Sequence, residues 1–93
     1  MSATPALVQH VRAQILPLLA AHGRPQAHSL LARAVDRLPV RSKTILALGY
    51  HHELTLPEMA AVLELPVHTL RWQAQDAVEE LRLALLALLE DAA

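Results

Sequence analysis

Histidine, serine and acidic side chains are the groups in this 93-residue chain whose types could do chemistry. Six histidines are present, and the densest group of metal-ligand types is His51-His52-Glu53. Consecutive side chains on a helix point about 100° apart, so these three cannot converge on one ion. The spacing therefore predicts no metal site.

Groups for covalent or phosphate chemistry are also missing from the sequence. The chain has no cysteine, which excludes thiol catalysis and cysteine-based zinc sites. Its serines, Ser2, Ser29 and Ser42, stand outside any nucleophile-elbow sequence. Its two glycines are isolated and cannot form a phosphate-binding loop. We therefore predict that the chain is not an enzyme, takes no cofactor and has no small-molecule substrate.

With catalysis excluded, binding to another macromolecule is the remaining possibility. The residues that could carry out such binding lie between positions 55 and 81. Two expected helices are joined there by a turn over residues 64–66, and the second helix begins at Val67. This spacing is typical of a helix-turn-helix, whose second helix can lie in the major groove of DNA. On spacing alone, a plain helical hairpin is the alternative.

Five helices must position these residues. Apolar side chains recur at helical spacings in segments 4–22, 25–37, 40–51, 55–63 and 67–89. Thr4 is the expected N-cap of the first helix, with Pro5 at its first helical position. Pro17 should kink this helix or make it restart, and Gly23 suits its C-cap.

Two sequence signals mark the boundaries of the later helices. Pro39 disfavours helical geometry at Leu38 and predicts a turn there. Thr55 as N-cap, with Glu58 three residues later, predicts a capping box. The expected buried side chains, helix by helix, are Leu7, Val8, Val11, Ile15, Leu18 and Leu19; Leu30, Leu31, Ala34, Val35 and Leu38; Ile45, Leu46, Leu48 and Tyr50; Met59, Ala60, Val62 and Leu63; and Leu70, Ala74, Ala77 and Leu81.

The composition favours an all-α fold, a five-helix bundle that contains a helix-turn-helix and a long last helix. Hydrophobic residues make up 54% of the chain with only one Tyr and one Trp, so Leu, Ala, Val and Ile must build the core. One domain is expected, in which an N-terminal helix over residues 1–25 packs on residues 26–93. No secretion signal or apolar run of roughly 20 residues is visible, which predicts a cytoplasmic protein without membrane contact.

Four stretches of the sequence together match a known pattern. They are residues 34–48 (AVDRLPVRSKTILAL), 50–63 (YHHELTLPEMAAVL), 65–70 (LPVHTL) and 77–82 (AVEELR). Through them, residues 26–83 resemble region four, the C-terminal domain, of bacterial sigma factors of the extracytoplasmic-function class. The resemblance implies a helix-turn-helix domain that reads an upstream promoter element and contacts the flap of the RNA polymerase β subunit.

Three features depart from the sigma-factor pattern. The promoter-melting domain is missing and residues 1–25 are too short to hold it, so the resemblance predicts a stand-alone region-four domain. Glu64 replaces the usual turn glycine, and a non-glycine residue in a left-handed turn costs roughly 1 kcal/mol. The recognition helix also lacks the several Lys and Arg residues that are typical of this class.

Charge is unevenly distributed along the chain, although the net charge is only −1. Residues 57–82 carry five acidic and two basic side chains, a net charge of −3, whereas residues 24–43 carry five basic and one acidic, a net charge of +4. Phosphate contacts dominate DNA affinity, and each contact needs a cation or a backbone donor. DNA binding is therefore expected to be weak, assisted by a partner, or absent.

Trp72 should face away from the core if the predicted apolar side of the last helix faces inward. It could pack on a thymine methyl group while Arg71 and Gln75 reach base edges. It could instead anchor a protein interface, where Trp and Arg are enriched. A third alternative is that the Trp72 side chain folds down over a neighbouring helix.

The C-terminal residues 81–89 are apolar nearly all round, which is typical of a helix that is buried on most sides. Either the N-terminal helix covers them, or a second copy or another protein does. In the second case Leu85, Leu86 and Leu89 would join Trp72 as interface contacts.

Two functions follow from these features. The first is a transcription regulator that acts at promoter DNA with RNA polymerase or a separate melting subunit. The residues assigned to DNA are His68, Thr69, Arg71, Trp72 and Gln75 at the bases, and Arg37, Arg41 and Lys43 at the phosphates. The second is a sigma-like interaction module that no longer reads DNA and binds the polymerase flap, an anti-sigma factor, or itself as a homodimer. A structural helical oligomer with no role in transcription is a third alternative.

Overall fold

The computed structural model describes residues 5–92 and contains five α-helices and one π-helical turn. The elements are α1 (Ala6–Leu19), α2 (Arg24–Asp36), α3 (Val40–Leu46), η1 (Ala47–His51), α4 (Leu56–Leu63) and α5 (Val67–Ala92). No strand is present over this range, so the predicted all-α fold is confirmed.

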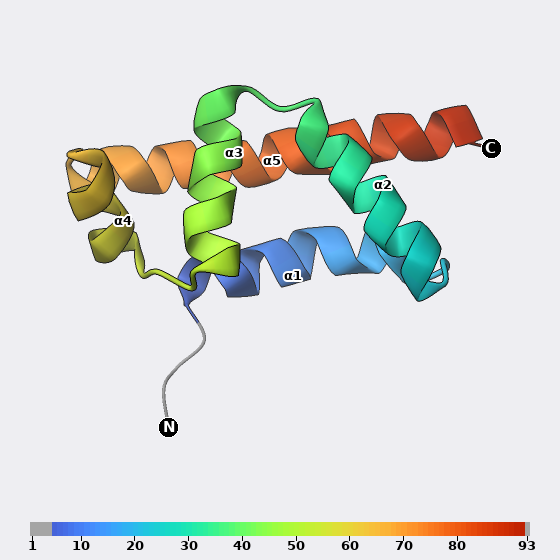
Figure 1. The fold of residues 1–93 in the computed structure, drawn as a ribbon, viewed down its shortest axis with the longest axis horizontal. Coiled ribbons are helices and arrows are strands. Elements are labelled where there is room, and N and C mark those ends of the chain that lie inside the picture. The colour runs from blue at the N-terminus through green and yellow to red at the C-terminus, as the bar shows by residue number, and fades with distance from the viewer. Residues whose placement is uncertain (1–4, 93) are drawn as a thin grey trace.

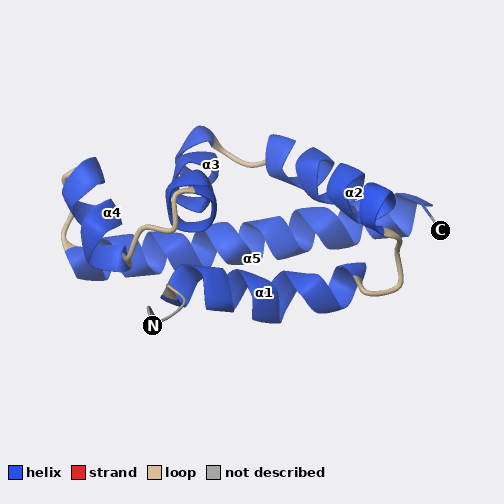
Figure 2. Cartoon of the chain, turned by 60° about the horizontal axis from the view of Figure 1, so that its bottom comes forward, coloured by secondary structure: helices blue, strands red, loops and turns tan. Residues whose placement is uncertain are grey.

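The longest helix, α5, determines the shape of the molecule. Its 26 residues span about 39 Å at 1.5 Å per residue, close to the longest dimension of 41 Å. Figures 1 and 2 show α1 alongside α5 and running in the same direction, with α2 and α3 crossing α5 and α4 at its N-terminal end. Every other α-helix therefore packs against α5.

The core lies where the other four helices meet α5. Its buried side chains in α5 are Leu70, Ala74, Ala77, Val78, Leu81, Leu85 and Leu88. Those that face them are Leu7, Val11, Ile15 and Leu19 of α1, Leu30 and Ala34 of α2, Leu38 of the turn between α2 and α3, Ile45 and Leu46 of α3, and Met59 and Ala60 of α4. The predicted inward face of α5 is confirmed, and α1 contributes to the same core.

The ends of α1 differ from the prediction. Thr4 lies outside the described residues, and Pro5 precedes α1 without a side-chain cap. Pro17 lies inside α1, and the helix ends two residues later instead of restarting. Gly23 is not the C-cap of α1, because Ala20 already takes that position; Gly23 is the N-cap of α2, with φ −67° and ψ 161°.

The third predicted helix is continuous from α3 into η1, but its last turn is π-helical. The His52 N–H donates to the Ala47 carbonyl five residues earlier, at 3.2 Å. A π turn spaces side chains differently from an α turn. Tyr50 is consequently 39% exposed, so its assignment to the buried set is wrong.

One assignment on α4 is also wrong. Val62 is 59% exposed, because α4 packs on the core through Met59 and Ala60 instead. None of the described helices is both long and apolar enough to cross a membrane.

Candidate functional site

A reciprocal pair of hydrogen bonds begins α4. The Glu58 backbone N–H donates to Thr55 Oγ1 at 3.2 Å, and the Thr55 N–H donates to Glu58 Oε1 at 2.9 Å. These bonds satisfy two N–H groups that the helix itself cannot pair. The predicted capping box is confirmed.

Three residues, Glu64, Leu65 and Pro66, join α4 to α5. Glu64 is left-handed, with φ 56° and ψ 46°. Its N–H donates to the Ala61 carbonyl at 3.3 Å, and the Leu65 N–H donates to the Ala60 carbonyl at 2.9 Å. This is the Schellman arrangement, in which glycine is preferred because a Cβ atom is strained there. The short turn expected between the two helices is therefore present, with Glu64 in its strained position.

The outward side of α5 carries the predicted tryptophan. Trp72 is 68% exposed, so the alternative in which it folds over a neighbouring helix is wrong. His68 and Asp76 lie one turn before and one turn after it, Glu79 follows on the same side, and all three are exposed. We call His68, Trp72, Asp76 and Glu79 the Trp72 face.

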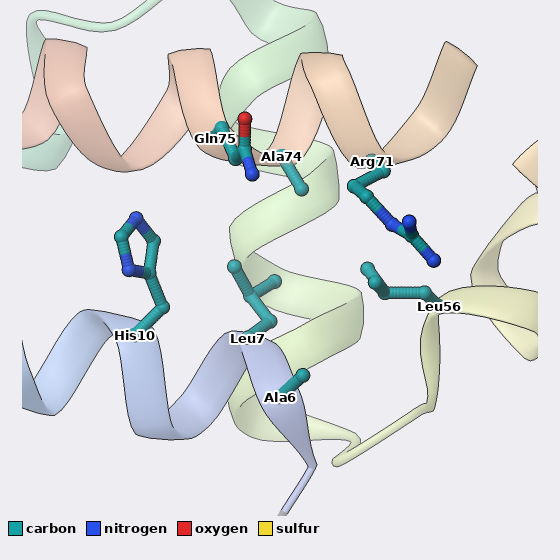
Figure 3. Close-up of a pocket in the computed structure, with 7 residues that line it drawn as sticks. All are labelled: Ala6, Leu7, His10, Leu56, Arg71, Ala74 and Gln75. Carbon is teal, nitrogen blue, oxygen red and sulfur yellow. The ribbon is translucent and has the colours of Figure 1, made fainter. Parts of the chain in front are cut away.

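Two residues predicted to contact bases lie on a different side of α5, next to α1. Arg71 and Gln75 line a surface pocket of about 360 Å³. Figure 3 shows its other walls, which are Ala6, Leu7 and His10 of α1, Leu56 of α4 and Ala74 of α5. An N-terminal helix therefore lies beside the segment that would enter a DNA groove.

His10 is a residue of this region that the sequence did not single out. Figure 3 shows its ring extending from α1 toward α5 near Gln75. A hydrogen bond from Arg82 lowers the pKa of Glu79, and the charge of His10 contributes a smaller lowering. His10 and Glu79 are 69 positions apart in the sequence, and a local sequence pattern cannot predict an electrostatic effect between residues so far apart.

The predicted phosphate contacts lie apart from the predicted base contacts. Arg37 and Arg41 are exposed and Lys43 is partly buried, around the junction of α2 and α3. The Ser42 hydroxyl, in the same turn, donates to Glu80 Oε2 at 3.0 Å. Glu80 is eight residues beyond Trp72, about 12 Å along the helix axis. Ser42, between Arg41 and Lys43 in the sequence, therefore contacts the middle of α5, whereas the base-contact residues His68, Arg71 and Gln75 are exposed on its first three turns and Thr69 is partly buried.

The remaining cation on this part of α5 is already paired. Arg82 Nη2 lies 2.6 Å from Glu79 Oε1, and its Nε donates to Glu79 Oε2 at 2.9 Å. This pairing offsets the positive charge that Arg82 could otherwise offer to a phosphate.

The C-terminal leucines divide between the core and the surface. Leu85 is fully buried between α5 and the neighbouring helices, so it cannot be the partner contact that was predicted. Leu86 and Leu89 are partly buried, and Leu83 is 53% exposed. The rest of the chain therefore covers most of the apolar C-terminal segment.

No group of three or more His, Asp or Glu side chains among residues 5–92 could hold a metal ion. His51, His52 and Glu53 are all exposed.

Comparisons of the chain with protein-family models, with curated proteins and with solved structures found no match.

Proposed function

We propose that this chain is a non-enzymatic helix-turn-helix domain that acts in transcription by binding a protein through the Trp72 face. The resemblance of residues 26–83 to region four of sigma factors supports the role in transcription. The α4–turn–α5 unit, with its capping box and Schellman turn, supports the helix-turn-helix.

The exposure of Trp72 carries the choice of a protein as partner. A 68% exposed tryptophan leaves most of its indole ring in water, and its burial by a partner would be favourable. Tryptophan is among the residues most enriched at the centres of protein interfaces. Trp72 is not one of the core residues, so its indole ring is not needed to fill the core.

Electrostatics favours the same choice. The Trp72 face carries the carboxylates Asp76 and Glu79, and Arg82 beside it is paired with Glu79. Phosphate groups would be repelled by this face, because DNA affinity depends on cations at the contact. A protein partner with an apolar pocket and basic residues at its rim would be attracted instead.

Three partners fit the resemblance to sigma factors. They are the flap of RNA polymerase, an anti-sigma factor and a second copy of this chain. The polymerase flap is the first to examine, since it is the contact that the resemblance implies for this domain.

Promoter DNA is the second candidate, favoured by the helix-turn-helix unit and by the exposure of His68, Arg71 and Gln75. In that case Arg37, Arg41 and Lys43 would hold phosphates. The helix α5 would have to enter the DNA groove with α1 beside it. DNA binding would therefore require either a bound polymerase or a displacement of α1.

The protein role is tested by binding purified core RNA polymerase to the wild type and to Trp72→Ala. We expect the variant to bind about 30-fold more weakly, the effect of an interface hot spot of about 2 kcal/mol. Leu83→Ala is the matched control, since it removes an exposed apolar side chain from the other half of α5 and should bind as the wild type does. Equal binding by Trp72→Ala would reject the Trp72 face as the contact.

The DNA role is tested by a salt titration of binding to promoter-length duplex DNA, with Arg41→Ala as the variant. Binding that weakens with salt and falls further in Arg41→Ala would favour the second candidate, and the slope would count its phosphate contacts. We expect no binding by the isolated chain at physiological salt.

A further inference from the structure

A second pocket lies between α1, α2, the α3–η1 segment and α5. It encloses about 150 Å³, and its walls are mainly apolar. The lining residues are Val11, Arg12, Ile15 and Leu16 of α1, Leu31 and Val35 of α2, Lys43, Leu46, Ala47, Tyr50 and His51 of α3 and η1, and Leu81 of α5. The Trp72 face contributes none of them.

Two large apolar side chains stay exposed because they line this pocket instead of filling it. Leu16 is 51% exposed and Tyr50 is 39% exposed. Tyr50 and His51 both belong to the π turn η1, and their rings meet edge to face with centroids 5.9 Å apart. Here the irregular turn carries two aromatic rings at the pocket.

The polar groups of the pocket are all cationic or neutral. Arg12 and Lys43 line it, and no Asp or Glu does. The ion pair formed within residues 5–92 is Arg82–Glu79, so neither cation of the pocket is paired with a carboxylate there. Two unpaired cations beside apolar walls favour a ligand with an anionic head and an apolar body.

We infer that this pocket binds a small amphiphilic carboxylate as a ligand, not as a substrate. Its carboxylate oxygens would accept hydrogen bonds from Arg12 and Lys43, and its hydrocarbon body would lie among Ile15, Leu31 and Val35. A volume of about 150 Å³ is large enough for one benzene ring, so a body of about six to eight carbons suits this pocket. A peptide helix needs a longer groove with several anchor sites. The inference does not depend on the proposed function.

Calorimetry and NMR with octanoate and benzoate as probes test the inference on the full chain. We expect octanoate to bind and to shift the amide signals of residues 46–51, and octanol, which has the same body without the charge, to bind about tenfold more weakly. Benzoate distinguishes an aromatic body from a linear one. Trp72→Ala should leave octanoate binding unchanged, so the failure of the proposed function and the failure of this inference are separable.

Two variants test the head and the body of the site. Lys43→Met should weaken octanoate binding about tenfold and leave octanol binding unchanged. Arg41→Met is the matched control, because Arg41 is exposed two residues away and does not line the pocket. Leu16→Trp places a larger side chain at an exposed lining position that the fold does not need filled, and it should abolish binding while the circular dichroism spectrum is retained.

Three results would overturn the inference. These are equal binding of octanoate and octanol, equal effects of Lys43→Met and Arg41→Met, and no octanoate binding at millimolar concentration. Binding of an acidic amphipathic peptide in place of octanoate would also overturn it, and would assign the pocket to a protein partner.

Discussion

Glu64 holds a backbone conformation that glycine would hold with less strain. Left-handed geometry costs a residue with a Cβ atom roughly 1 kcal/mol or more, while glycine adds freedom to the unfolded chain. We expect Glu64→Gly to raise the free energy of unfolding by about 0.5 kcal/mol, measured by urea denaturation, because relief of strain exceeds the entropic cost. Glu53, with φ 53°, is the other described non-glycine residue in this region.

Ala61→Gly is the matched control for this prediction. It introduces the same residue three positions earlier, at an exposed right-handed position of α4. There glycine should lower the free energy of unfolding by about 0.5–1 kcal/mol. If both variants destabilise the chain alike, Glu64 is not strained.

Glu58 gives the stability of the chain a pH dependence of known sign. A hydrogen bond from the Thr55 backbone N–H, and a smaller one from the Thr55 side chain, lower the pKa of Glu58. A carboxyl group whose pKa is lower in the folded state stabilises the fold above its unfolded pKa, and this contribution disappears as the pH falls through the folded pKa. The difference in unfolding free energy between the wild type and Glu58→Gln should therefore be largest at neutral pH and shrink in acid. A difference that is constant over this range would contradict the prediction.

At the residue scale, interactions between residues close together in the sequence can be predicted, whereas interactions between residues far apart in the sequence cannot. Thr55 and Glu58 are three positions apart, and the outward orientation of Trp72 follows from helical spacing, so both could be predicted. The Ser42–Glu80 hydrogen bond joins residues 38 positions apart, and its existence depends on how two helices cross. The same holds for the pocket that Arg71 and Gln75 share with α1.

At the scale of elements, the apolar periodicity predicts the helices but not their irregular turns. When η1 is counted with α3 as one segment, all five predicted segments begin and end within three residues of the observed bounds. The π turn η1 was not predicted, because it depends on packing between α1 and the α3–η1 segment, which periodicity along one helix does not contain. Tyr50 was therefore assigned to the core and lies at a pocket instead.

Gly49 explains how η1 can approach α1 closely. A Cβ atom at Gly49 would overlap Leu7 Cδ2 and would lie 3.0 Å from Leu7 Cγ and 3.3 Å from Leu7 Cβ. The overlap is with Cδ2, and the contacts with Cγ and Cβ are tight; because Leu7 is itself buried in the core, its side chain has little room to move away. We expect Gly49→Ala to lower the free energy of unfolding by about 1–3 kcal/mol, the usual cost of overpacking, as measured by thermal denaturation.

A double-mutant cycle with Leu7→Ala tests the cause of this effect. If the added methyl group collides with Leu7, the cost of Gly49→Ala should fall in the Leu7→Ala background. An unchanged cost would attribute the effect to the backbone of the π turn instead.

At the scale of the whole molecule, burial of the C-terminal leucines decides whether the fold needs a second copy. Leu85 is fully buried by the chain itself, and Leu83 is 53% exposed. We expect Leu85→Ala to lower the free energy of unfolding by about 3–5 kcal/mol and Leu83→Ala by less than about 0.5 kcal/mol. The wild-type melting temperature should not depend on protein concentration. A melting temperature that rises with concentration, or a large loss in Leu83→Ala, would show that another copy covers this segment.

The packing of every other α-helix against α5 has a consequence for folding during protein synthesis. The helices α1 to α4 have 14, 13, 7 and 8 residues, and isolated helices of such length are marginal in water. Each of these helices packs against α5, so the core is completed only when Leu70, Leu81 and Leu88 of α5 have been translated and have left the ribosome exit tunnel. The nascent chain therefore stays open until α5 emerges, its apolar side chains are exposed to chaperones during that interval, and the core then forms in one late step.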